Sequence, residues 1–210
     1  ISAGNNKLFK GTSTLADNTP GSYTVSANNW KAVNFNDHAF FFQRAHEPLV
    51  YTHSVGNLEK MSAHSGSAGT PPQGNEVLAA FGRLFVADFA SDKSTIKWSD
   101  TLDGTVWTGG ATGSIDITNV WPTGYDEIVA LAAHNGFLII FGKDSIVIYS
   151  GASAPASMTL EDTISNIGCV SRDCVVSTGK DLIFLDRSGV RSLARTIQEK
   201  SSPIGDISKN

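Results

Sequence analysis

Residues 127–151, EIVALAAHNGFLIIFGKDSIVIYSG, decide the fold because they contain three short apolar runs separated by two turns. The runs are Ile128–Ala133, Phe137–Phe141 and Ile146–Tyr149. Each run is too short for an ordinary helix, and the last two are rich in the β-branched and aromatic residues that favour strands. The pair Asn135-Gly136 is a strong hairpin signal, since both residues tolerate positive φ. The stretch therefore predicts an antiparallel β meander.

The run Phe137–Phe141 is apolar at every position, without the polar alternation of a strand that faces water on one side. Continuous apolar strands are typical of sheets that are covered on both faces. A small meander can be covered in this way only if further sheets stack against it. The sequence therefore predicts that the meander recurs along the chain.

Three further segments repeat the pattern of apolar runs and turns, namely 30–52, 76–99 and 174–193. Turns near residues 37, 82, 136 and 179 are spaced 45, 54 and 43 residues apart. A unit of several short strands that recurs every ~40–50 residues is typical of a β-propeller blade. We therefore expect an all-β, propeller-like array of about four to five antiparallel meander blades. A β-sandwich of unrelated hairpins is the alternative.

The two ends of the chain complement each other in this scheme. Two outer strands, Lys7–Lys10 and Ser22–Val25, precede the first full repeat, whereas few residues follow the last one. Pairing of the N-terminal with the C-terminal strands would close the array and remove exposed sheet edges.

Other segments are expected to connect the blades. Residues 61–75 are polar and rich in Pro and Gly, which predicts a loop. The longest inter-blade insertion is 101–124, with a short strand at 114–117. A short helix is compatible with residues 195–200.

Composition limits the classes of protein that fit. The chain has 210 residues, with 16 Lys and Arg against 20 Asp and Glu, and a formal net charge of −4. A dedicated nucleic-acid binder would normally carry a basic stripe. The apolar runs are too short to span a bilayer. At this length we expect a single propeller-type domain over 1–210. Because the chain begins with Ile1 and not with Met, we also expect it to be a fragment of a longer chain.

No constellation of residues predicts catalysis. The five histidines form no His-x-x-x-His pair and no order with a serine and an aspartate around a nucleophile elbow. Paired acids such as Asp126-Glu127 are typical of exposed turns. Cys169 and Cys174 make no disulfide framework and are expected to be reduced thiols. We expect no enzyme activity, no cofactor and no metal site.

Residues Ser99–Trp107, SDTLDGTVW, are similar to the Asp-box turns of sialidase-like propellers, Ser-x-Asp-x-Gly-x-Thr-Trp. The segment has one residue too few between Asp103 and Gly104. Such boxes are structural turns, so this segment is not evidence for chemistry.

Four residues are candidates for a partner-facing surface. Trp107 and Trp121 lie in the 101–124 insertion, and large aromatic side chains on a loop can mark a partner surface. The alternative is that they fold back and cap the blade core. Arg44 and His46, in a polar turn before Leu49, are the other two candidates.

Residues 126–151 and Gly168–Ser171 resemble the central region of short-tailed-phage tail proteins. These are the nozzle or tail tubular protein B and the related packaged-DNA stabilisation protein. The family pattern is a polar lead-in, Ile-x-x-Leu/Ile, a turn, an apolar strand ending in Phe-Gly, then Ile-x-Ile/Val-Tyr and Ser-Gly. The segments that match it are Glu127–Leu131, Phe137–Gly142 and Ile146–Gly151. The turn Asp186–Val190 and the segment Asn5–Gly11 also fit, so the likeness covers most of the chain.

The resemblance implies a structural virion protein of the phage tail, assembled in the host cytoplasm. Family members form a hexameric ring below the portal and adaptor, with the propeller set on a longer chain. The implied partners are further copies of the chain, the portal and adaptor, and tail-fibre or tail-needle proteins. DNA is implied only as non-specific cargo in the channel, and no membrane is involved. At 210 residues the chain is far shorter than a whole nozzle protein.

Two other functions are compatible with a propeller. A carbohydrate-binding or glycan-cleaving propeller domain of a phage tail protein would have a central cleft of acids and aromatics, lined by Trp107 or Trp121. A host-type interaction propeller is disfavoured because the sequence has no clean WD-like signature.

Overall fold

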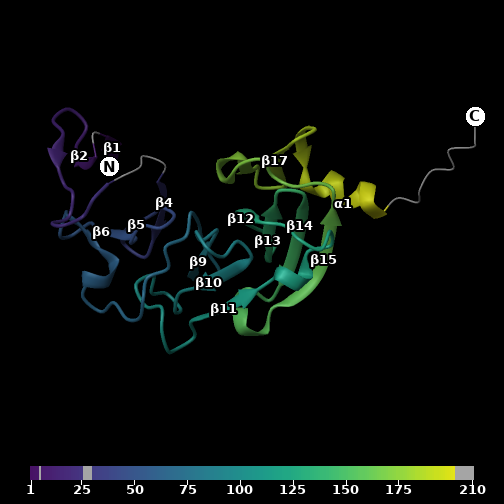
Figure 1. Cartoon of the computed structure of the whole chain (residues 1–210), viewed down its shortest axis with the longest axis horizontal. Helices are drawn as coiled ribbons and strands as arrows, with labels where there is room; N and C mark the ends of the chain where they lie inside the picture. Colours follow the sequence, from purple (N-terminus) through teal and green to yellow (C-terminus); the bar gives the residue numbers. More distant parts are fainter. Residues whose placement is uncertain (5, 26–29, 202–210) are drawn as a thin grey trace, which may run out of the picture. The chain divides into compact units, whose positions relative to one another are not determined.

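A computed structural model describes residues 1–4, 6–25 and 30–201 (Figure 1). The chain divides into two compact units, Ile1–Asp116 and Ile117–Asn210. The boundary falls within the 101–124 insertion, a division that the sequence pattern did not predict. Asn5, which begins the Asn5–Gly11 match, lies outside the described residues.

The described strands of the first unit form three antiparallel sheets in which consecutive strands are neighbours. The first sheet contains β1 (Ser2–Gly4), β2 (Lys7–Lys10) and β3 (Ala16–Asp17). The second contains β4 (Lys31–Phe35), β5 (His38–Phe42), β6 (Leu49–Thr52) and β7 (Leu58–Lys60), which the short 3-10 turn η1 (Met61–Ala63) follows. The third contains β8 (Glu76–Ala80), β9 (Arg83–Ala87), β10 (Thr95–Trp98) and β11 (Gly113–Asp116).

The second unit contains two antiparallel sheets and one helix among its described residues. Its four-stranded sheet contains β12 (Ile128–His134), β13 (Phe137–Gly142), β14 (Ser145–Ser150) and β15 (Thr159–Ser165). Its three-stranded sheet contains β16 (Val175–Ser177), β17 (Leu182–Asp186) and β18 (Gly189–Ser192). Short 3-10 turns are η2 (Thr118–Val120), η3 (Pro155–Ser157) and η4 (Arg172–Cys174).

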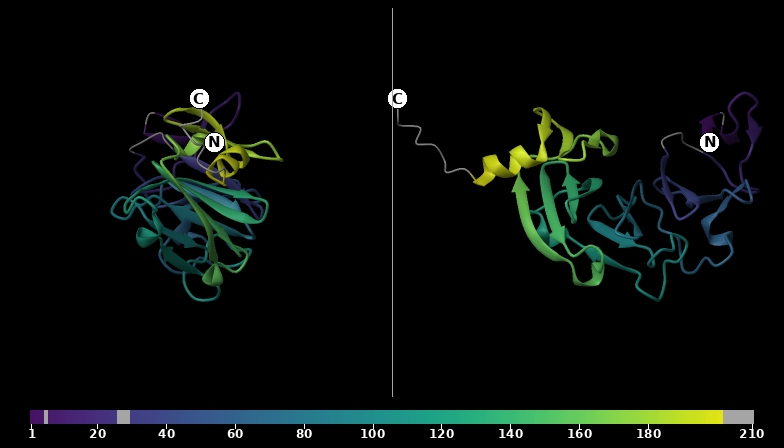
Figure 2. Two further views of the ribbon diagram at one scale, coloured as in Figure 1. Left: turned by 90° about the vertical axis from the view of Figure 1, so that its right-hand side faces the viewer. Right: turned by 180° about the vertical axis from the view of Figure 1, so that it is seen from behind.

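The helix α1 (Leu193–Ser201) directly follows β18 and contacts β17 and β18 (Figure 2). Its last turn also reaches β15, where Lys200 forms an ion pair with Asp162. The helix confirms the element expected at residues 195–200 and begins two residues earlier. Within the described ranges, no helix combines the length and the apolar character that crossing a bilayer requires.

The sheets confirm the predicted all-β class and the predicted meanders. Each of β4–β7, β8–β11 and β12–β15 is one four-stranded meander, and none of the described sheets closes into a barrel. The strand expected at 114–117 is β11, shifted by one residue. However, β1–β3 and β16–β18 form separate sheets, so the expected pairing of N-terminal with C-terminal strands is not found among the described strands.

The strand expected at Ser22–Val25 is wrong. Ser22 has a φ of 59°, and the backbone N–H of Tyr23 donates to Pro20 O at 3.1 Å, so the chain turns there instead of extending. The side chains of Tyr23 and Val25 nevertheless pack against apolar residues of β5–β7. In the N-terminal sheet, the outer strands beside β2 are β1 and β3, which the sequence pattern did not predict.

The sheet β4–β7 is covered on both of its faces. Phe40 and Phe42 of β5 belong to a cluster with Val77, Leu84 and Val86 of the β8–β11 sheet. Phe41, which points to the opposite face, belongs to a cluster with Leu8 and Val25. Successive residues of a strand point to opposite faces, so three consecutive phenylalanines bind two neighbouring layers.

The central strand of the deciding stretch, β13, is buried along its whole length except at Phe137. Ile139 and Phe141 face a cluster shared with Phe184 and Leu193 of the same unit. Leu138 and Ile140, on the other face, are fully buried as well. The turn before β13 has positive φ at both Asn135 and Gly136. The predicted hairpin and the predicted two-sided burial of this strand are therefore confirmed.

We expect the substitution Ile139→Asp to unfold the second unit. Ile139 is 2% exposed inside an apolar cluster, and an unpaired carboxylate there should cost more than about 4 kcal/mol of unfolding free energy. Leu160→Asp in β15 is the matched control, because Leu160 is 44% exposed and should tolerate the charge. Urea denaturation followed by circular dichroism measures both. An Ile139→Asp chain with the wild-type unfolding midpoint would contradict the burial described here.

Candidate functional site

A pocket of about 250 Å³ lies at one end of the β4–β7 sheet in the first unit. Three segments form it: the β4–β5 turn, the residues after η1, and the loop that follows β10. It is lined by Phe35, Asn36, His38, Phe40, His64, Ser65, Leu102, Asp103, Gly104 and Thr105. All of these residues belong to the first unit, so the pocket is a feature of one compact body.

The β4–β5 turn is fixed to the loop after β10. Asn36 and Asp37 both have positive φ, as a tight two-residue hairpin turn requires. The side-chain amide of Asn36 donates to Leu102 O in the loop. One wall of the pocket is therefore held to another by a direct hydrogen bond.

The loop itself is an aspartate-stabilised turn. Asp103 Oδ1 accepts hydrogen bonds from the backbone N–H of Thr105 at 2.8 Å and from its hydroxyl at 2.7 Å. Trp107 Nε1 donates to Gly104 O at 3.1 Å and lies 3.2 Å from Met61 Sδ. The SDTLDGTVW segment is thus a structural turn, as its similarity to an Asp box predicted, in spite of the missing residue.

The third wall, after η1, is tied to the same loop. Ser67 Oγ donates to Thr105 O at 3.2 Å, and Trp107 N donates to Ala68 O at 2.7 Å. Ala68 and Val106 also form a parallel β-bridge. These bonds fix the position of His64, which lies just before the bridged residues.

Two histidines meet in this pocket. Their ring centroids are 5.1 Å apart and the ring planes are nearly perpendicular, at 88°. His38 Nδ1 lies 2.6 Å from Asn36 O, and His64 Nδ1 lies 2.7 Å from Glu59 Oε1. A carbonyl oxygen and a carboxylate oxygen both accept, which assigns the hydrogen of each ring to Nδ1. His38 and His64 are therefore oriented by their Nδ1 atoms.

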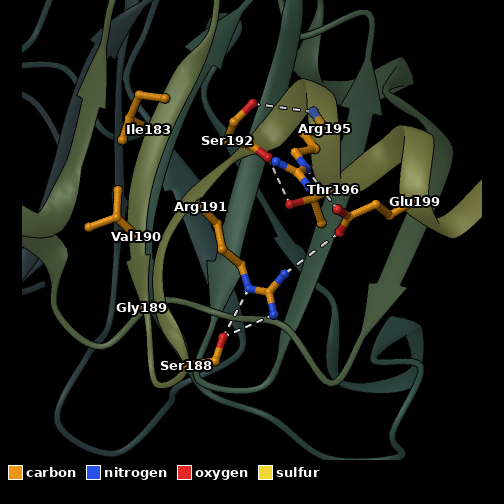
Figure 3. A pocket seen from close by; sticks show the side chains of 9 residues that line it. All are labelled: Ile183, Ser188, Gly189, Val190, Arg191, Ser192, Arg195, Thr196 and Glu199. Carbon is orange, nitrogen blue, oxygen red and sulfur yellow. Dashed lines mark hydrogen bonds and ion pairs between the residues drawn. The ribbon is translucent and has the colours of Figure 1, made fainter.

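A second pocket, of about 430 Å³, lies in the other unit between β18 and α1 (Figure 3). Arg191 of β18 points from the sheet toward α1, where Glu199 lies within 3.9 Å of its guanidinium. Arg195 Nε donates to the same carboxylate at 2.8 Å. Because the Glu199 carboxylate interacts with both guanidinium groups, neither Arg191 nor Arg195 is an unpaired cation in this pocket.

Two aspartates accept hydrogen bonds at the start of α1 and at the β17–β18 turn beside this pocket. Asp181 Oδ1 accepts from the backbone N–H of Ala194 at 3.0 Å, and Ser192 Oγ accepts from that of Arg195 at 3.2 Å. These are the N-terminal amides that a helix cannot satisfy internally. Asp186 accepts from the backbone N–H of Ser188 at 3.0 Å and from Arg191 Nε at 3.2 Å.

The charge state of Asp186 follows from these bonds. Burial by itself raises the pKa of this carboxyl, but the hydrogen bonds from Ser188, from the backbone N–H of Gly168 and from Arg191 outweigh burial and lower the pKa to about 2. Asp186 is therefore ionised in the folded chain at neutral pH, which keeps Arg191 in place.

Of the four candidates for a partner-facing surface, the structure leaves only Arg44 exposed. Trp121 is 4% exposed, so its indole is not available to a partner, and Trp107 is half-buried against the cluster around Phe40. Both cases fit the alternative, in which these rings cap the core. Arg44 is exposed but paired with Asp88, and His46 is half-buried with its ring against Trp30. Arg44 and His46 lie on one turn, apart from both tryptophans in sequence.

The His38–His64 pair was not predicted from the sequence pattern. The two residues are far apart along the chain and carry no local motif, so no spacing rule could find them. In the part of the chain that the structure describes, no group of three or more His, Cys, Asp or Glu is arranged to hold a metal ion. Cys169 and Cys174 are free thiols, and Cys169 is buried.

Comparison with known proteins gives no family model that matches the chain and no matching curated protein.

Gly104 is required where the loop passes over the core of the first unit. A Cβ at this position would lie 2.6 Å from Phe40 Cζ and 2.7 Å from Leu84 Cδ1. We expect Gly104→Ala to lower the unfolding free energy by about 1–3 kcal/mol, because overpacking forces buried side chains to move. Gly21→Ala, which meets no atom within 4 Å, is the control and should change stability by less than about 0.5 kcal/mol. Equal melting temperatures for the two variants would refute the close approach.

We expect acid to destabilise the second unit through Asp186. The pKa of this carboxyl is lower in the folded chain, about 2, than its ordinary value of 3.8, so its contribution is fully present above about pH 4 and is lost as the pH falls toward 2. The contribution is about 2 kcal/mol by the linkage relation. Urea unfolding at pH 7, 4, 3 and 2 should show a flatter acid response for Asp186→Asn than for the wild type. Parallel pH profiles would contradict the assignment.

Proposed function

We propose that this chain is the blade-bearing part of a structural tail protein of a short-tailed phage, of the nozzle or tail tubular type. The observation that carries the proposal is that the residues behind the family resemblance form one connected motif. Residues spread over the lead-in, the Phe-Gly strand end and the Gly-Cys element meet at a single point of the second unit.

Asp126 is the centre of this motif. Its Oδ1 accepts from the backbone N–H of Lys143 at 2.9 Å, and its Oδ2 accepts from that of Asp144, also at 2.9 Å. The carboxylate thus closes the turn between β13 and β14. Gly142, the last residue of β13, leaves room for this carboxylate, because a Cβ there would lie 2.3 Å from Asp126 Oδ2 and would displace it.

The Gly168-Cys169 element closes the other side of the same turn. Cys169 N donates to Gly142 O at 2.8 Å. A Cβ on Gly168 would lie 2.3 Å from the carbonyl of Lys143, so only glycine allows the two backbones to come this close. The matched residues therefore depend on one another physically. This interdependence supports the resemblance.

The proposed role is mechanical. Short meander sheets with apolar residues on both faces, as in β5 of the first unit and β13 of the second, make each unit a firmly packed platform suited to docking other tail proteins. In the proposal, six copies of the longer chain form a ring below the portal and adaptor, and tail-fibre or tail-needle proteins dock on it. A net charge of −4 is compatible with a conduit, because a cationic wall would bind the passing phosphates.

The glycan-binding alternative is less well supported. It required Trp107 or Trp121 to line an open cleft with acidic residues. Trp121 is buried, Trp107 packs on the core, and neither lines the pockets described above.

Assembly of the full-length parent protein tests the proposal. Mass photometry and negative-stain microscopy of the parent are expected to show a six-fold ring with a central channel. The isolated 210-residue chain is expected to be monomeric, because the family places its propeller on the periphery of the ring. A parent protein that stays monomeric at micromolar concentration, and that is absent from the tails of purified virions by peptide mass spectrometry, would exclude the proposal.

A further inference from the structure

We propose that His38 and His64 bind a first-row transition-metal ion, with Zn²⁺ as the reference ion. The inference is independent of a role in a phage tail. It rests on the orientation of the two rings, the distance between them and the pocket in front of them.

In both imidazoles, Nε2, the nitrogen that would bind a metal, is available. Nδ1 of each ring is engaged by a fixed acceptor, Asn36 O for His38 and Glu59 Oε1 for His64. In the described part of the chain, Nε2 of neither ring has a hydrogen-bond partner. A histidine that ligates a metal almost always donates its other ring N–H to a carbonyl or a carboxylate. His38 and His64 show one arrangement of each kind.

The separation of the rings fits joint ligation. With metal–nitrogen bonds of about 2.1 Å and a tetrahedral angle between them, the centres of two ligating imidazoles lie about 5 Å apart. The observed distance between the ring centroids is 5.1 Å. The ring planes are nearly perpendicular, at 88°, so the two imidazoles do not stack face to face.

The surroundings favour a cation and leave room for it. Both rings line the 250 Å³ pocket, which also contains the carboxylate of Asp103 and the hydroxyls of Ser65 and Thr105. The side chain of His64 is 14% exposed, so it is oriented by its surroundings and still reachable. Since no third His, Cys, Asp or Glu completes a ligand set in the described residues, water or a ligand from solution fills the remaining positions. We therefore expect an open site of modest affinity.

The walls of the pocket are held before any metal arrives. The Asn36–Leu102 and Ser67–Thr105 hydrogen bonds fix the segments that carry the two histidines. A site whose ligands are already oriented loses less entropy on binding than one that must assemble them. The hydrogen bond that His64 Nδ1 donates to Glu59 Oε1 also fixes the orientation of the His64 ring.

Isothermal titration of the whole chain with ZnCl₂, and separately with NiCl₂, tests the site. We expect one ion per chain, with at least tenfold weaker binding in His38→Gln and in His64→Gln. His46→Gln is the matched control: its Nδ1 lies 2.9 Å from Arg44 O in the same local geometry, but its ring packs against Trp30 instead of a second histidine. Its affinity for the metal should equal that of the wild type.

Two further measurements protect the test against variants that misfold. Glu59→Gln keeps both imidazoles and should weaken zinc binding by about 10- to 100-fold through the lost carboxylate. X-ray absorption of the zinc-loaded wild type should show two imidazole ligands. A wild-type chain that binds no metal, binding that is unchanged in His38→Gln and His64→Gln, or an absorption spectrum without paired imidazoles would each overturn the proposal.

Discussion

The short sheets of this protein are stable only when their faces are covered. The second strand of a sheet provides for this, because its side chains alternate between the two faces. No three- or four-stranded meander of this size buries enough apolar surface alone, so each sheet needs a neighbour. In the first unit, β5 supplies Phe40 and Phe42 to one neighbouring sheet and Phe41 to the other. In the second unit, Ile139 and Phe141 of β13 join a cluster with Phe184 and Leu193, and Leu138 and Ile140 on the other face are also fully buried.

The connections between strands convert this packing into defined sites. The two-residue turn Asn36-Asp37 places His38 at the start of β5, and the aspartate turn around Asp103 brings a distant loop over the same end of the sheet. In the other unit, Asp126 performs a comparable task for the turn after β13. In both units a side-chain oxygen replaces the backbone partners that a tight turn leaves unsatisfied. These polar side chains therefore lie at the ends of the sheets.

Local patterns in the sequence were sufficient for the class of fold and for most strands. The Asn135-Gly136 turn, the all-apolar run after it and the recurrence of the pattern predict β12–β14 and the equivalent strands closely, because these features depend on neighbouring residues. The outer strands were harder. Ala16-Asp17 has no strand pattern, and Val25 contributes a buried side chain from a turn. The His38–His64 pair was not predictable, since it forms only when three separate segments are brought together by packing and hydrogen bonds.

The three consecutive phenylalanines of β5 also restrict how such a chain can change in length. Adding one residue within β5 would exchange the faces of every side chain beyond it, so that Phe41 would take the place of its neighbours and both adjoining layers would lose their contacts. Insertions are therefore compatible only with connections, such as the stretch between β10 and β11, where the repeat is already longest. Blade strands keep a fixed parity along the chain, while loops are free to diverge in length and to acquire new surfaces.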